Sequence, residues 1–235
     1  MLFYDNLEKY VTGQREKLAE LHKANIPERG IILRVLASEE NQTKSTNVAN
    51  YSVTREVNQI QINHLGILGD RHHRAVRPST GREKSLYPKG TFIREHRHVF
   101  VVSPYDCKIL SDLLNFDVKP ELLGANLVIG REDGQDYSIS SLPQNTYLLI
   151  ASNEAREFTK PPIATLKHYV LQQGCGITGN SIAERYGDKS LTQKFMASSK
   201  DNRGIVCSVE QPVDNPAIIN SGQIIFFKFP MGIAP

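Results

Sequence analysis

The sequence predicts a mainly β fold, namely a β-barrel with short helices inserted in its loops and a helix at its N-terminus. About eight strand-like segments do not alternate regularly with helical ones, a pattern that favours a barrel over a doubly wound parallel sheet. The 235 residues are enough to bury a full core, and 40% hydrophobic and 23% charged residues are ordinary for a globular protein. No apolar run approaches the ~20 residues of a membrane span.

Residues 3–23 are predicted to form an amphipathic helix, because apolar residues recur every three or four positions between charged ones. Pro27 and Gly30 then stop the helical pattern. The chain is therefore divided into an N-terminal helical extension, a β-barrel domain and a C-terminal tail. These parts comprise residues 1–29, 30–229 and 230–235.

Strands of the first half are predicted where β-branched or alternating residues lie between turn residues. They are expected at 30–36, 53–62 and 98–102, with a polar loop at 38–50 and a second long loop at 74–91. Loops of this length inside a compact domain are usually functional or disordered.

A helix is predicted after the third strand. Ser103 is placed as its N-cap, Pro104 at its first position and Asp106 three residues after the cap. The helix is expected to run to about Asn115, with Cys107 on its apolar face.

The second half is predicted to add five strands, a glycine-rich loop and two short helices. Asn180 or Ser181 is expected to cap the first helix and Gly187 to end it. A turn that leads into the first of these strands is expected at 123–129. The other strands are expected at 147–151, 165–171, 203–210 and 223–229, the loop at 174–180 and the second helix at 191–197.

Basic charge is concentrated between Gly66 and His98. This stretch contains eight Lys/Arg against three Asp/Glu, a local charge of +5, whereas the whole chain carries only +3. Five of the seven histidines lie between His64 and His98. Such a concentration indicates an anionic ligand rather than a general role in solubility.

The segment Asp70-Arg71-His72-His73 follows a predicted strand and two glycines. Asp70 can anchor a turn, Arg71 offers a planar fork for phosphate or carboxylate, and the histidines can donate hydrogen bonds. The alternative is that Asp70 and Arg71 form a structural pair that fixes the turn.

The segment His96-Arg97-His98 is predicted to open a strand, with the two histidines on one face and Arg97 on the other. A zinc or iron site made by His72, His73 and this pair is a weaker alternative. Such pairs are common, and the arginines would repel a cation.

The three cysteines form neither a disulfide framework nor a CxxC site, and no N-terminal signal pattern is present, so the protein is expected to be cytoplasmic. Cys107 and Cys207 fall on apolar faces and are predicted to lie in the core. Cys175 lies between glycines before a predicted helix, where a thiolate is stabilised. A reactive or ligating role is predicted for Cys175, and an unrelated loop cysteine is the alternative.

Five pieces of the chain together resemble one known family. In chain order, they are Gly66–His73, Arg97, Leu123–Leu127, Ala183–Asp188 and Arg203–Ile205. They resemble the MOSC domain, the C-terminal module of molybdenum cofactor sulfurases that also occurs as standalone bacterial proteins. The resemblance covers roughly residues 30–229. It implies a β-barrel with inserted helices, a role in handling molybdenum cofactor or sulfur through one cysteine and, at family level, pyridoxal phosphate binding.

The resemblance implies that the basic residues hold an anionic ligand, such as the phosphate of a molybdopterin-type cofactor. Cys175 would ligate molybdenum or carry sulfur as a persulfide, as in a cofactor sulfurase or a molybdenum-dependent reductase. The family's cysteine position corresponds to Gly179 or Asn180, a few residues after Cys175. The cofactor-binding residues implied are Asp70, Arg71, His72, His73, Arg97 and Asn126.

The alternative function is a non-catalytic anion-binding module of the same fold that has lost the cysteine chemistry. Expected partners are a small anionic cofactor or substrate and a redox or sulfur-donor protein. Nucleic acid is not expected, because the basic residues are not interleaved with aromatic ones and the total charge is small. A membrane partner is not expected either.

Overall fold

The computed structural model describes residues 29–38, 53–80, 83–135, 137–152, 160–171 and 174–230. The predicted helix at 3–23 lies outside the described residues. So do the N-terminal extension except Arg29, the polar loop at 38–50 except Ser38, and the C-terminal tail except Pro230.

The predicted β-barrel is confirmed. In the described part of the chain, seven strands form a closed sheet, because the strand at one end of the sheet order also pairs with β1. The pair β7–β8 is parallel and the other barrel pairs are antiparallel. Around the barrel the strands are β1 (Arg29–Ser38), β13 (Ile224–Lys228), β9 (Tyr147–Ile150), β10 (Ala164–Leu171), β11 (Ile205–Gln211), β7 (Val99–Val102) and β8 (Leu127–Gly130).

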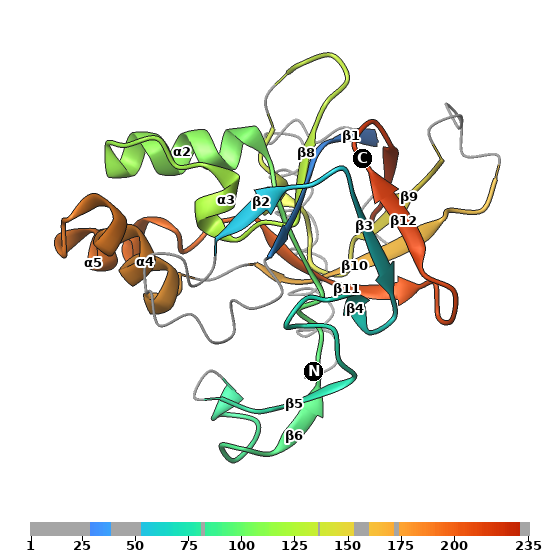
Figure 1. The fold of residues 1–235 in the computed structure, drawn as a ribbon, viewed down its shortest axis with the longest axis horizontal. Coiled ribbons are helices and arrows are strands. Elements are labelled where there is room, and N and C mark those ends of the chain that lie inside the picture. Colours follow the sequence, from blue (N-terminus) through green and yellow to red (C-terminus); the bar gives the residue numbers. More distant parts are fainter. Residues whose placement is uncertain are drawn as a thin grey trace, which may run out of the picture.

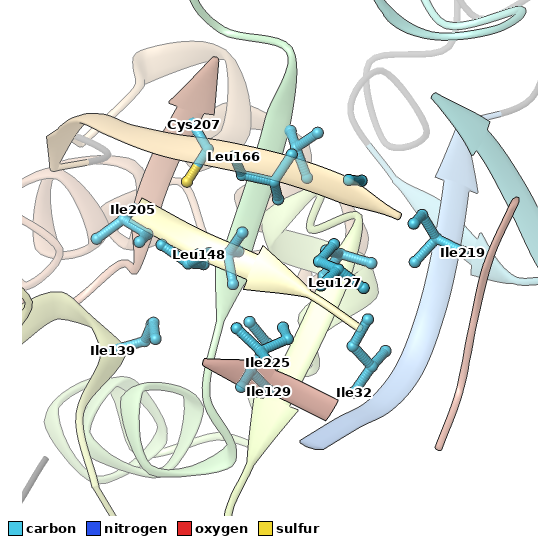
Figure 2. Packing of buried hydrophobic residues seen from close by; sticks show 14 of the residues in the cluster. Ile32, Leu127, Ile129, Ile139, Leu148, Leu166, Ile205, Cys207, Ile219 and Ile225 are labelled. Atoms are coloured by element: carbon cyan, nitrogen blue, oxygen red, sulfur yellow. The ribbon is translucent and has the colours of Figure 1, made fainter. Parts of the chain in front are cut away.

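The barrel interior is filled by aliphatic side chains at alternate strand positions (Figure 2). Cys207 is 0% exposed among them, as the sequence predicts. Strand β7 is buried on both faces: Val99 and Val101 belong to the barrel core, whereas Phe100 and Val102 pack under the helices. β7 is thus the central strand between barrel and helices.

The helices gather on one side of the barrel (Figure 1). The predicted start of α2 is confirmed, since Ser103 and Asp106 form a capping box, and Cys107 is buried on its inner face. None of the described helices is long and apolar enough to cross a bilayer. The helical segments are α2 (Pro104–Leu114), α3 (Pro120–Leu123), η4 (Ile139–Ser141), α4 (Gly176–Tyr186) and α5 (Ser190–Ser198).

The prediction of a glycine-rich loop at 174–180 is wrong, because α4 begins at Gly176 with Cys175 as its N-cap. The glycines allow close packing of helices instead of a turn. A Cβ added to Gly179 would lie 3.1 Å from the carbonyl oxygen of Thr192 in α5. Gly187 ends α4 in the left-handed conformation, as predicted.

The predicted strand at 53–62 divides into β2 (Thr54–Glu56) and β3 (Gln59–Asn63). β2 pairs with β1, whereas β3 leaves the barrel and forms a small sheet with β4 (Gly66–Ile67) and β12 (Ala217–Asn220). The sequence did not predict β12.

The predicted loop at 74–91 begins with β5 (Val76–Pro78), which pairs with β6 (Phe92–Arg94) just beyond it. The resulting hairpin projects away from the barrel (Figure 1). Strands of three residues are too short to show a period-two pattern, which is why this hairpin is not evident in the sequence.

Candidate functional site

The carboxylate of Glu95 lies at the centre of the basic segment and is 0% exposed. Arg97 donates two hydrogen bonds to it, from Nε at 2.9 Å and from Nη2 at 3.0 Å. Arg74 donates from Nη2 at 3.2 Å, and His72 Nδ1 lies 3.3 Å from the carboxylate. The Nε atom of Arg77 is 3.3 Å away. One buried anion therefore orders three arginines and one histidine.

Burial by itself would raise the pKa of Glu95, but the hydrogen bonds from His72 and Arg97 outweigh it. The pKa of Glu95 is therefore held well below its usual range. Arg77, 4% exposed, also donates to Glu83 at 2.5 Å, and this bond lowers the pKa of Glu83 to about 2. Both carboxylates are ionised at neutral pH.

Glu95 also forms hydrogen bonds with the backbone that follows it. Its Oε1 accepts hydrogen bonds from the backbone N–H groups of His96 at 3.2 Å and Arg97 at 3.1 Å. The prediction that His96–His98 opens a strand is wrong, because β7 starts at Val99 and the N–H groups of His96 and Arg97 bond to a side chain instead of a neighbouring strand. Instead of sharing a strand face with His98, His96 stacks on Tyr169 of β10, with ring centroids 4.4 Å apart.

Asp70 and His73 fasten the loop that carries Arg71 and His72. Asp70 accepts hydrogen bonds from the backbone N–H of His72 at 2.8 Å and from the hydroxyl of Ser38 at 2.6 Å. The His73 ring nitrogen Nε2 lies 3.1 Å from the side-chain oxygen of Asn63. Both side chains thus stabilise the conformation of the loop. For Asp70 this is the turn-anchoring role that the sequence allows.

His72 connects the exposed Arg71 to the buried Glu95. Arg71 Nε donates to His72 Nε2 at 3.2 Å, which requires a lone pair on Nε2 and places the proton on Nδ1, facing Glu95. Burial lowers the pKa of His72, and the charges of Arg71 and Arg97 lower it further, so this neutral form is favoured. His72 thus orients Arg71, and both its ring nitrogens are occupied.

Asn126 is buried where three strands meet. Its side-chain oxygen accepts from the backbone N–H of Phe100 at 2.9 Å, and its backbone N–H donates to the carbonyl of Phe100 at 2.7 Å. Its own carbonyl accepts from Leu36 at 2.8 Å. The side-chain oxygen predicted to bind a ligand is therefore bonded to β7, and the backbone of Asn126 joins the start of β8 to β7 and β1.

Cys175 is partly exposed at the N-terminus of α4. It follows β10, whose Leu171 pairs with Ile205, and Ile205 pairs with Val101 toward the end of β7. Glu95 precedes the other end of β7, so Cys175 and Glu95 lie toward opposite ends of that strand.

The described residues contain no group of three His, Cys, Asp or Glu side chains that could hold a metal ion.

The structure thus brings together three of the predicted site residues, Arg71, His72 and Arg97. Sequence reasoning did not single out Glu95, Arg74 or Arg77 as site residues. The signal available for Glu95 was a lone acid between Arg94 and His96. We call the following group the Glu95 cluster: Arg71, His72, Arg74, Arg77, Glu83, Glu95 and Arg97.

No family model matches the chain, and no curated protein matches it. Among solved structures, the chain is similar to the crystal structure of APC1665, the YuaD protein from Bacillus subtilis. The TM-score is 0.66 at 23% sequence identity, over 85% of this chain and 95% of YuaD. This likeness shows that the two proteins share a fold.

Proposed function

We propose that the chain is a MOSC-type protein that binds a small phosphate-bearing anion at the Glu95 cluster. The observation that carries the proposal is the charge balance of the cluster. Four guanidinium groups face two carboxylates, so a positive surplus remains after the buried ion pairs are made.

The surplus charge is accessible to a ligand. The side chains of Arg74 and Arg97 keep 43% and 25% of their surface exposed, and Arg71 is exposed as well. Guanidinium groups suit phosphate because their planar N–H fork matches two oxygens at once. The bonds to Glu95 and His72 fix these side chains before a ligand arrives, which reduces the entropy cost of binding.

The phosphate of a molybdopterin-type cofactor suits this arrangement, because the exposed guanidinium groups supply the charge that a phosphate needs. The metal would require a thiolate. Cys175, the partly exposed cysteine, lies toward the opposite end of β7 from Glu95, so metal ligation by Cys175 is a separate proposal. The cofactor would supply the redox or sulfur-transfer chemistry. The residues of the Glu95 cluster would hold its anionic group and keep it oriented.

The test is titration of the purified protein with inorganic phosphate, measured by calorimetry, in the native chain and in Arg71→Ala. We expect a loss of about 10-fold in affinity, because a charge-assisted donor is removed. Arg29→Ala is the control, since Arg29 forms an exposed ion pair with Glu132 on the barrel. If Arg71→Ala lowers stability but leaves phosphate affinity unchanged, Arg71 serves the fold and not the ligand.

A second candidate function is sulfur transfer or molybdenum ligation by Cys175. Of the three thiols, Cys107 and Cys207 are buried, and Cys175 caps a helix of 11 residues. Arg203 donates at 2.9 Å to Thr178 and adds positive charge to the first turn of that helix. In this role the protein would act in the cytoplasm with a redox or sulfur-donor protein.

A further inference from the structure

The buried imidazole of His98 carries a donor that lacks an acceptor. His98 is 2% exposed, and its Nδ1 accepts a hydrogen bond from the backbone N–H of Val209 at 3.1 Å. A ring nitrogen that accepts is unprotonated, so the neutral ring carries its proton on Nε2. Burial lowers the pKa of His98 to about 4, and the neutral form therefore persists at neutral pH.

This Nε2–H has no hydrogen-bond partner among the residues that the structure describes. Glu95 does not fill the gap, because its two oxygens accept from Arg97, Arg74 and His72. A buried donor without an acceptor is rare in folded proteins. Such a donor is satisfied when an oxygen atom, from a ligand or from water, lies beside the ring.

His98 lies under the loop that carries Arg71 and His72. A Cβ added to Gly66 of β4, just before that loop, would be 3.4 Å from the Cβ of His98 and 3.1 Å from the carbonyl oxygen of His72. The charge of Glu95 acts on the titration of His98. The donor therefore belongs to the same region as the Glu95 cluster and is more deeply buried than the exposed arginines.

We propose that Nε2–H of His98 donates a hydrogen bond to an oxygen of the anion held by the Glu95 cluster. The ligand is then a tetrahedral oxyanion, either inorganic phosphate or a phosphate monoester, with oxygens shared between exposed guanidinium groups and a buried imidazole. This inference rests on the proposed anion binding and deepens it, because it adds a neutral donor that requires an oxygen acceptor.

His168 offers a matched comparison within the same barrel. It is 1% exposed, and its Nδ1 faces the carbonyl oxygen of Pro143 at 2.9 Å, so its proton lies on Nδ1. Its Nε2 is then a buried acceptor, also without a partner among the described residues. An acceptor of this kind repels the lone pairs of an oxyanion, so His168 is not expected to contribute to phosphate binding.

The test has two measurements on the full chain at pH 7.5. In protein labelled with 15N-histidine, inorganic phosphate is expected to shift the Nε2–H resonance of His98, whereas sodium chloride at equal ionic strength is not. His98→Asn retains a side-chain oxygen for the N–H of Val209 but removes the Nε2–H donor. It is expected to weaken phosphate binding by about 5- to 10-fold. His168→Asn is expected to bind phosphate as the native chain does.

Each outcome decides the proposal. If phosphate binds but neither the His98 resonance nor the affinity of His98→Asn changes, the inference is wrong, the donor holds a water molecule and the proposed anion binding stands. If the native chain binds no phosphate, both fail. If His98→Asn does not fold, the resonance of the native protein decides alone.

Discussion

The substitution Glu95→Gln tests how far the basic segment depends on its buried carboxylate. Glutamine has nearly the same shape, so the change removes a charge without creating a cavity. Arg77, whose side chain is 5% exposed, keeps an ion pair only with Glu83 among the described residues. Arg97 and Arg74 lose the negative charge with which they form ion pairs. Breaking a buried ion pair on one side costs about 3–5 kcal/mol.

For a chain of this length, a loss of that size lowers the midpoint of thermal unfolding by about 6–20 °C. The assay is urea and thermal unfolding followed by circular dichroism at pH 7.5. The matched control is Glu56→Gln, which removes an ion-pair partner of Arg34 that is 58% exposed. We expect the control to cost less than about 1 kcal/mol. A loss in Glu95→Gln no larger than in the control would refute the idea that Glu95 organises the segment.

Two further predictions concern pH and thiol reactivity. Because burial lowers the pKa of His98 to about 4 from 6.5, the unfolded chain binds a proton between these values that the folded chain does not, so stability should fall as pH drops from 6.5 to 4. The assay is urea unfolding across this range. Between pH 6.5 and pH 4 the free energy of unfolding should fall more in the native chain than in His98→Asn, by at most about 3 kcal/mol. Equal losses in the two proteins would contradict the prediction. Iodoacetamide should modify Cys175 before Cys107 and Cys207, because burial raises the pKa of Cys107 to about 12 and also raises that of Cys207. Mass spectrometry after limited labelling ranks the three thiols, and equal rates would remove the support for sulfur transfer.

The barrel could be predicted from the sequence because its strands carry apolar residues in short runs between turn residues. The start of α2 was predictable for a local reason, since Ser103, Pro104 and Asp106 are adjacent and form the cap within one turn. The start of α4 was not. Gly176 and Gly179 suggest a loop locally, and only the neighbouring α5 shows why small residues are needed there.

The residues of the candidate site were predicted in part. Arg71 and His72 were singled out by residue type and charge, which the sequence displays directly, and Arg97 by the family resemblance. The role of Glu95 depends on burial and on contacts with Arg74 and Arg77, 21 and 18 positions earlier in the chain. No local pattern encodes those contacts. Asn126 shows the converse case, because its amide suits a ligand but the fold uses its oxygen between strands.

A buried acid within the proposed anion-binding site has a physical reason. Glu95 cancels one positive charge, but it also fixes the side chains of Arg74 and Arg97, each of which would otherwise lose ~2 kcal/mol of conformational freedom on meeting a ligand. His72 extends the same order to Arg71 by accepting its Nε–H. An anion arriving at the cluster therefore meets arginines that are already positioned, with more positive than negative charge still present. Since affinity depends on how much freedom is lost as well as on charge, one buried carboxylate can strengthen a site for a second, external anion.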